Sequence, residues 1–157
     1  MQRVLVVDKN KQPLMPCHPA RARELLRKRK AAVYRQLPFT LILMEREGGE
    51  TQPVALKIDP GSKTTGMALV ADFKRGKRLI WAAELQHRGQ QIRDKLLSKR
   101  QLRRSRRSRH TRYRPARFDN RRRPVGWLAP SLQSRVENIW TWEHRLSKTC
   151  PITSSAQ

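Results

Sequence analysis

The sequence predicts a mixed α/β (α+β) protein with a small αβ module, a partial β-sheet and a long arginine-rich helix. Three observations lead to this fold class. Short β-rich runs flank a helical segment within roughly the first fifty residues. Three strand-length apolar runs, joined by two tight turns, lie between residues 53 and 86. From Arg88 to Pro115 the chain contains no other proline and is dominated by cations.

The net charge indicates the class of partner. The 157 residues include 36 Lys and Arg against 12 Asp and Glu, which gives a formal net charge of +24 at pH 7. This charge predicts a polyanionic partner. We expect nucleic acid, and a membrane surface is the alternative. No run approaches the roughly 18 apolar residues of a spanning helix, and "MQRVLVVDKN" is too soon interrupted for a signal peptide. We therefore expect a cytoplasmic protein.

Residues 1–52 form the predicted αβ module. The β-rich run "RVLVVD" ends at the turn-like "KNKQP", and a second run, "AVYRQLPFTLILME", ends at "REGGE". Between them, "PARARELLRKRKAA" starts with proline and has no internal breaker, which predicts a helix. The module therefore has a strand, a helix and a strand, and the helix presents six cations: Arg21, Arg23, Arg27, Lys28, Arg29 and Lys30.

Residues 53–87 predict three strands in an antiparallel meander. The runs "PVALKID", "TTGMALVADF" and "RLIWAAELQ" are separated by the turns "PGSK" and "KRGK". Three strands alone are marginally stable, and we find no strand signal further along the chain. We therefore expect something absent from this chain to complete the sheet, and the free chain to be partly unfolded until it binds RNA.

Residues 88–114 predict an arginine-rich helix of about two dozen residues, roughly 36 Å long. Arginines recur at 100, 103, 104 and 107, whereas Arg106 and Arg109 point to another side. Between Arg88 and Arg123, 16 cationic residues face two acids, a net charge of +14. Such a helix repels itself unless phosphates surround it, and the alternative is a disordered basic tail.

Residues 115–157 predict a basic loop and a final helix. The loop "FDNRRRPVGWLAP" is rich in proline, glycine and arginine and carries Trp127, for which base stacking and packing are equally plausible. The helix begins at Ser131 and is closed by Pro151. We expect Trp140 and Trp142 to be core or helix-packing residues rather than base-stacking ones.

Asp59 is the candidate catalytic and metal-binding residue, since it ends an apolar run in "LKIDPGSKTTGMALV". A P-loop is excluded because position 62 is Ser and position 57 is Lys. Three alternatives stay open on these residues. Asp59 could fix the Asp-Pro-Gly turn, belong to a phosphate-binding hairpin like that of sugar-kinase and actin-like ATPases, or hold Mg²⁺ in a nuclease. The arginine-rich segment favours the nuclease.

Four motifs follow one another along the chain: "QPLMP" at 12–16, "KIDPGSKTTGMALV" at 57–70, the arginine run at 93–114 and "RFDNRRRPVGWLAP" at 117–130. In their order and spacing they resemble the N-terminal part of the IscB family of transposon-encoded, RNA-guided DNA endonucleases. The resemblance implies a PLMP domain (1–52), a first RuvC segment with an incomplete RNase H-like fold (53–87), an arginine-rich bridge helix (88–114) and a connecting segment (115–157). It also implies a guide (omega) RNA, target DNA and Mg²⁺ as partners and cofactor.

The same resemblance carries over Asp59 as the one RuvC metal ligand in this sequence. The family's further RuvC carboxylates and its HNH domain would have to come from the missing portion of the nuclease, so we expect a fragment that is inactive alone. The alternative is a standalone RNA-binding protein without catalysis. The predicted nucleic-acid-binding residues are Arg93, Lys99, Arg100, Arg103, Arg104, Arg106, Arg107, Arg109, Arg112, Arg114, Arg121, Arg122, Arg123 and Trp127.

Overall fold

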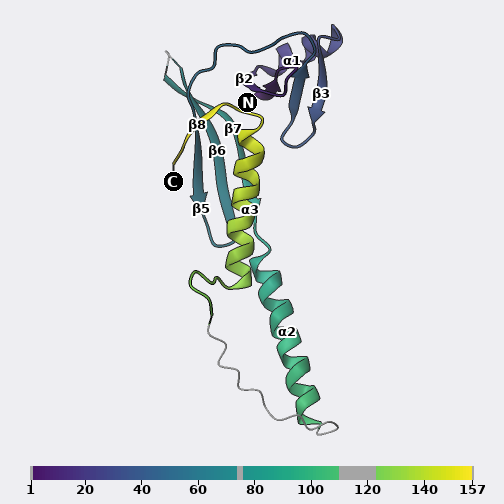
Figure 1. Cartoon of the computed structure of the whole chain (residues 1–157), viewed down its shortest axis with the longest axis vertical. Helices are drawn as coiled ribbons and strands as arrows, with labels where there is room; N and C mark the ends of the chain where they lie inside the picture. Colours follow the sequence, from purple (N-terminus) through teal and green to yellow (C-terminus); the bar gives the residue numbers. More distant parts are fainter. Residues whose placement is uncertain (1, 74–75, 110–122, 157) are drawn as a thin grey trace. The chain divides into compact units, whose positions relative to one another are not determined.

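The computed structural model describes residues 2–73, 76–109 and 123–156, and it confirms the mixed α+β class. The described part holds two four-stranded sheets and three helices (Figure 1). The chain divides into two compact units. Unit 1 comprises Met1–Gln86 with Ile139–Gln157, and unit 2 comprises His87–Asn138.

The first sheet belongs to unit 1 and has the strand order β2-β1-β4-β3. β1 and β4 are parallel, whereas β2 and β3 pair antiparallel with their neighbours. One helix packs on this sheet, beginning at Pro19, where the His18 side chain accepts a hydrogen bond from Ala20 N at 3.2 Å. The elements are β1 (Val4–Val7), β2 (Pro13–Cys17), α1 (Pro19–Arg27), β3 (Ala31–Arg35) and β4 (Thr40–Leu43).

Two details of this sheet correct the sequence prediction. The run 32–45, predicted as one strand, is divided into β3 and β4 by a turn that contains the cis Leu37–Pro38 bond. The segment Pro13–Cys17, which was not predicted as a strand, forms β2. Proline is tolerated there because β2 is an edge strand, which leaves one side of its backbone without a partner strand.

The second sheet, also in unit 1, contains the predicted meander. β5 (Val54–Pro60), β6 (Thr64–Phe73) and β7 (Gly76–Gln86) pair antiparallel, which confirms that prediction. The expectation that nothing else in the chain adds to this sheet is wrong. A fourth strand, β8 (Ile152–Ala156), pairs parallel to β5 and gives the order β7-β6-β5-β8.

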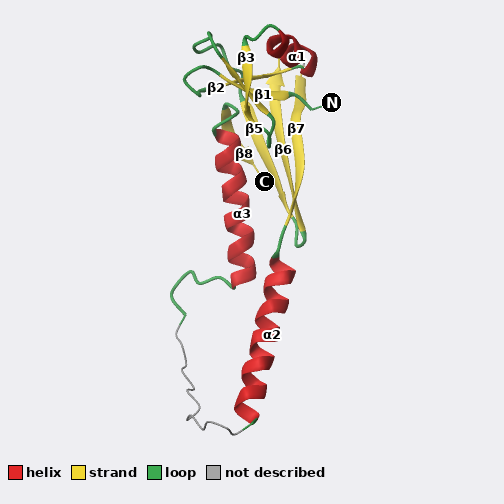
Figure 2. Cartoon of the chain, turned by 90° about the vertical axis from the view of Figure 1, so that its right-hand side faces the viewer, coloured by secondary structure: helices red, strands yellow, loops and turns green. Residues whose placement is uncertain are grey.

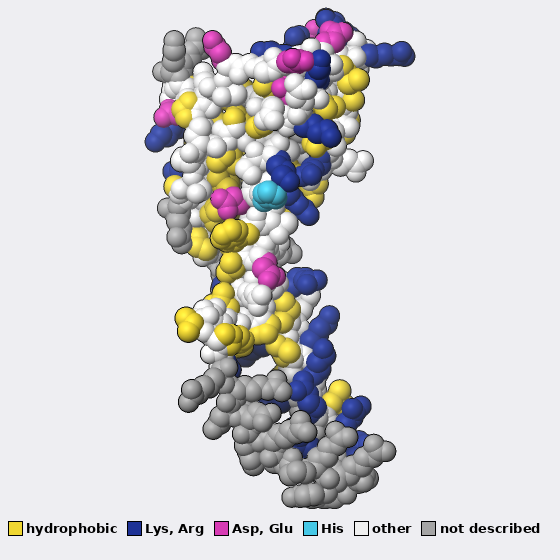
Figure 3. Space-filling model, in the orientation of Figure 1, with side chains coloured by type: hydrophobic (Ala, Val, Ile, Leu, Met, Phe, Trp, Pro, Cys, Tyr) yellow, Lys and Arg dark blue, Asp and Glu magenta, His cyan; other side chains and the backbone are white. Residues whose placement is uncertain are grey.

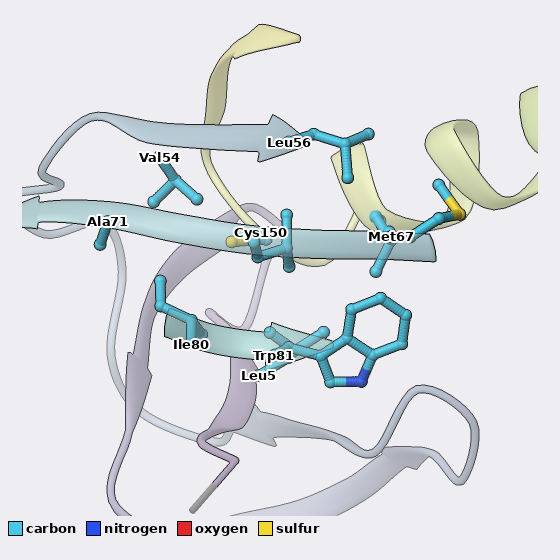
Figure 4. Packing of buried hydrophobic residues seen from close by; sticks show 10 residues of the cluster. Leu5, Val54, Leu56, Met67, Ala71, Ile80, Trp81 and Cys150 are labelled. Atoms are coloured by element: carbon cyan, nitrogen blue, oxygen red, sulfur yellow. The ribbon is translucent and has the colours of Figure 1, made fainter. Parts of the chain in front are cut away.

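Unit 1 has two hydrophobic clusters: Val4, Ala22, Ala31 and Leu41 form one between the first sheet and α1, and the other joins the two sheets. Leu5 of β1 is fully buried in the same cluster as Leu56 and Leu69 of the second sheet (Figure 4). The backbone N–H of Arg3 also donates to Ile80 O at 2.8 Å. Burial raises the pKa of the Cys150 thiol in this cluster to about 12, so Cys150 packs as an apolar group. The predicted domain boundaries stay a prediction.

The C-terminal half of α3 (Pro130–Ser147) covers one face of the second sheet (Figure 2). Leu146 is fully buried, and the ring of Trp142 stacks on that of Trp81 with centroids 6.2 Å apart. The predicted packing of Trp142 is therefore confirmed. That of Trp140 is wrong, because its side chain points away from the core and is 69% exposed. The helix starts one residue before the predicted Ser131.

Unit 2 contains the predicted arginine-rich helix and the first half of α3. The helix, α2 (Gly89–Ser108), has 20 residues and a length of about 30 Å, slightly less than predicted. A Cβ atom added at Gly89 would lie 3.6 Å from Ser131 O, so the start of α2 packs closely on the start of α3. Across the described residues, no helix is both long and apolar enough to span a membrane.

Candidate nucleic-acid interface and candidate metal site

The candidate nucleic-acid interface is α2, a helix with no buried residue. From Arg88 to Arg109, ten cationic residues face Asp94 alone, which gives a net charge of +9. Asp94 accepts a hydrogen bond from Gln90, and no salt bridge to another described residue involves a cation of α2. The cations therefore repel one another and leave their hydrogen-bond donors available for phosphate.

The cations lie on two sides of α2. Successive residues turn by 100°, so Arg93, Arg100, Arg104 and Arg107 fall on one side of the helix. A surface hollow of about 610 Å³ follows this side and is lined by Leu97, Arg100, Gln101, Arg103, Arg104 and Arg107. Lys95, Lys99 and Arg106 fall on the second side. Figure 3 shows Lys and Arg side chains along α2.

A third side of α2 carries no cation. It contains Gln90, Asp94, Ser98, Gln101 and Ser105, all within about 80° of one another around the helix axis. The cations of α2 span about 180° around the helix axis, so phosphates would meet roughly half of the circumference. This neutral stripe was not predicted, although the helical periodicity of the sequence indicates it.

His87 precedes α2 without adding to its charge. Burial, and secondly the positive charge of Arg135, lower the pKa of the His87 imidazole from its ordinary value of about 6.5. The side chain is therefore neutral at pH 7. The positive field of unit 2 therefore comes from its Arg and Lys side chains.

The loop after α2 is described from Arg123 onward. The Arg123 guanidinium lies over the Trp127 ring, 3.8 Å from its centroid, and Trp127 is 41% exposed. The pair presents a cation beside a partly open aromatic ring, which suits a phosphate and an unpaired base. The predicted contacts at Arg112, Arg114, Arg121 and Arg122 lie outside the described residues.

Asp59, the candidate metal ligand, lies in unit 1 as the next-to-last residue of β5, with its side chain exposed. The hairpin that follows depends on Gly61, because a Cβ there would lie 2.2 Å from Thr64 O. Across the ladder, Asp59 pairs with Gly66, and a Cβ at Gly66 would lie 3.6 Å from the Asp59 Cβ. The missing side chain leaves one flank of the carboxylate open.

Glu84 of β7 continues the same cross-strand row, since it pairs with Gly66 from the other side. Asp59 and Glu84 line one open hollow of about 980 Å³, whose floor includes Gly66, Ala68 and Ala82. Residues that alternate along a strand share a face, so both carboxylates project from the same face of the sheet. Glu84 was not predicted as a site residue.

The described residues fit Mg²⁺ only in part. Asp59 supplies the hard oxygen ligand that Mg²⁺ prefers, and its carboxylate is accessible. Nowhere in residues 2–73, 76–109 and 123–156 do three or more metal-ligating side chains come together. The remaining ligands of an octahedral ion would have to be water, phosphate oxygens or carboxylates from elsewhere.

Comparison of the sequence with known protein families identifies the family of this chain. A family model described as "RRXRR protein" matches residues 4–157. The chain belongs to the RRXRR protein family. It contains the pattern R-R-x-R-R once, at 103–107, near the C-terminal end of α2, with Ser105 at the variable position. In this RRXRR protein, the pattern puts two arginines on each side of a residue of the neutral stripe. No curated protein matches the chain.

Proposed function

We propose that this RRXRR protein is the N-terminal part of an IscB-like, RNA-guided DNA endonuclease. In this proposal α2 binds the guide RNA, and Asp59 supplies the first RuvC ligand for Mg²⁺. The observation that carries the proposal is α2 itself, a 20-residue helix with no buried residue and a net charge of +7 between Gly89 and Ser108. Burial does not stabilise such a helix, whereas a surrounding polyanion does.

The position of Asp59 supports the catalytic part of the proposal. β8 runs parallel to β5 toward the edge where Asp59 lies, and Ala156 pairs with Lys57, two residues before Asp59. A carboxylate entering beside β5 at this edge would therefore come close to Asp59. Bound Mg²⁺ would activate water and stabilise charge on a scissile phosphodiester. Asp59 would hold the ion through its carboxylate, and Lys57 on the same face would attract the phosphate.

A second candidate function is RNA binding without catalysis. The observation that favours it is the incomplete ligand set, because Asp59 belongs to no group of three metal-ligating side chains in the described part. Both functions use α2 in the same way, and they differ only in the role of Asp59.

The salt dependence of RNA binding tests the shared part of the proposal. If α2 and its loop neutralise roughly six to ten phosphates, log affinity for a structured RNA should fall with log salt at a slope of about −5 to −9. Arg103→Ala and Arg107→Ala should each make the slope less steep by about one unit, measured by fluorescence anisotropy.

Arg78→Ala is the matched control, since Arg78 is an exposed arginine on β7, in the other unit. It should leave the slope unchanged. A slope near zero for the unmodified protein, or equal effects of all three variants, would show that α2 is not the RNA-binding element.

A further inference from the structure

Unit 1 contains a cavity that the proposed function does not use. It has a volume of about 340 Å³ and lies on the α1 side of the first sheet, bordered by α1 and the loop 45–50. Its size is at the lower end of the ~300–1,000 Å³ range of small-molecule sites, enough for one nucleoside. The lining residues divide into apolar walls, among them Val6, Leu14, Leu25 and Leu43, and an exposed charged rim.

The rim offers both cations and hydrogen-bond acceptors. Its charged residues are Arg21, Lys30, Glu45, Arg46 and Glu50, all of them exposed. Arg21 is engaged by Glu24 at 2.7 Å, whereas Lys30, Arg46 and the two rim glutamates form no ion pair with another described residue. Arg46 Nε donates to Gly48 O at 3.2 Å, which leaves its two terminal nitrogens and the Lys30 ammonium for a phosphate. Glu45 and Glu50 can accept from the donor groups of a base.

The loop that forms one wall is fixed in place. Gly48 N donates to Oδ2 of Asp8 at 3.0 Å, and Lys9 N donates to Arg46 O at 3.2 Å. Asp8 is itself buried, with 2% of its surface exposed. The cavity is thus built into the free protein, which lowers the entropic cost of filling it.

We propose that this cavity receives one unpaired nucleotide of the bound RNA. The base would enter between the apolar walls, with its edge toward Glu45 or Glu50, and its phosphate would lie against Lys30 and Arg46. Arg23 and Arg27 are exposed on α1 without an ion pair to a described residue and would contact the flanking backbone. Single-stranded bases are read in this way, by pockets beside cationic groups. The inference rests on RNA as the partner, although not on α2.

Paired hairpin RNAs, one fully base-paired and one with a single-nucleotide bulge, test the inference in anisotropy measurements. The unmodified protein should bind the bulged hairpin about tenfold more tightly, since removing on the order of 60 Å² of apolar surface from water contributes roughly this factor. Gly49→Leu should remove most of this preference. A Cβ at Gly49 lies 2.9 Å from Arg46 Nη2 and 3.5 Å from Leu14 Cδ2, so the new side chain displaces the Arg46 guanidinium and occupies the cavity. Lys30→Ala should weaken the preference for the bulged hairpin while leaving the cavity open.

Thr51→Leu is the matched control, because Thr51 is an exposed loop residue that does not line the cavity. It should retain the preference, and a thermal melt should show that all variants are folded. No preference in the unmodified protein, or an undiminished one in both Gly49→Leu and Lys30→Ala, overturns the inference. Competition by adenosine monophosphate at the concentration of the RNA would do so too, because it would indicate a free-nucleotide site. The salt slope of α2 is measured separately, so failure here leaves the proposed function standing.

Discussion

Asp59 has two properties that a single substitution separates: it precedes a tight turn, and its carboxylate is exposed beside a glycine. Asparagine also favours turns but lacks the negative charge. Asp59→Asn should therefore keep the fold and RNA affinity. If the proposed function is right, then in an assembly supplied with the RuvC and HNH segments of an IscB-family nuclease, guide RNA and Mg²⁺, it should slow RuvC cutting of one DNA strand. The loss in cutting rate should exceed the roughly 10–100-fold that is typical when a residue hydrogen-bonded to a metal ligand is mutated.

Glu84→Gln should be measured in the same cutting assay as Asp59→Asn, because Glu84 lines the same hollow from the far side of Gly66. Normal cutting by Asp59→Asn would mean that Asp59 only forms the turn. Joint loss of RNA binding and thermal stability in that variant would lead to the same conclusion. Guide-dependent cutting of the two DNA strands can be followed separately on end-labelled duplexes.

Asp8 is the residue whose charge should tie the stability of unit 1 to pH. Its carboxylate is buried and accepts hydrogen bonds from Gly48 N at 3.0 Å and Gln12 N at 2.7 Å. The hydrogen bond from Gly48, followed by those from Gln12 and Asn10, outweighs burial and lowers the pKa of Asp8. A lowered folded-state pKa stabilises the protein above the unfolded pKa, about 3.9, and this contribution is lost as pH falls through the folded pKa.

Asp8→Asn should therefore lower Tm by several degrees at pH 7, and the gap to the unmodified protein should narrow below about pH 4. Thermal melts between pH 3 and pH 7 measure this. Asp72→Asn, at an exposed position of β6, should change Tm little at any pH. A constant difference in Tm between pH 3 and pH 7 would show that Asp8 stabilises unit 1 through the shape of its side chain rather than through its charge.

At the scale of elements, α3 offers a direct test of its packing through two tryptophans two residues apart. Trp142 stacks on Trp81 and is half-buried, whereas Trp140 is 69% exposed. Trp142→Ala should cost about 2–3 kcal/mol of unfolding free energy, less than a fully buried Trp because part of the ring is already in water. Trp140→Ala should stay within about 0.5 kcal/mol of the unmodified protein. Urea unfolding measures both, and similar losses would contradict the orientation of α3.

Strand signals in the sequence were reliable where apolar residues alternate and turns are explicit, as in β5, β6 and β7. They failed for β8, because "ITSSA" is short and polar and becomes a strand by pairing with buried β5. They also failed for β2, whose prolines argue against a strand except at an edge. Both misses are strands formed by tertiary pairing rather than by local preference.

The candidate site shows the same division. The exposure of Asp59 follows from strand alternation, but the position of Glu84 depends on a register shift between Leu69 and Val70 in the β6–β7 pairing. Without that irregularity Gly66 would oppose Ala83, and the side chain of Glu84 would project from the other face. Sequence alone does not place such a shift, so it could not bring the two carboxylates to one face.

At the scale of the whole molecule, the two units should differ in stability without RNA. Unit 1 has two four-stranded sheets, and β8 supplies to the second sheet the strand that was expected from outside this chain. We therefore now expect unit 1 to be folded without RNA. In unit 2, α2 has no fully buried residue and carries mutually repelling cations, and its described packing lies near its first turn, at Gly89. A helix of this kind is marginal in water by itself.

Hydrogen exchange should resolve this difference residue by residue. In the free protein at low salt, amides of β5 and β6 should be protected by the global unfolding free energy, while amides from about Lys95 to Ser108 should exchange with little protection. Adding a structured RNA should protect α2 and raise the helical circular dichroism. The rise should reach at most roughly two fifths of the helical signal, because α1, α2 and α3 hold 9, 20 and 18 residues.

Ser105→Pro supplies the control, since proline in a helix interior costs about 3 kcal/mol and Ser105 lies on the side of α2 without cations. This variant should lose the RNA-induced gain while every cation remains present. If α2 were as protected as β6 in the free protein, the helix would be stabilised by contacts that its exposure does not reveal. If β5 and β6 were unprotected until RNA was added, unit 1 would depend on the RNA for its fold. The difference between the two units would then no longer hold, because RNA would act on the core of unit 1 rather than on α2.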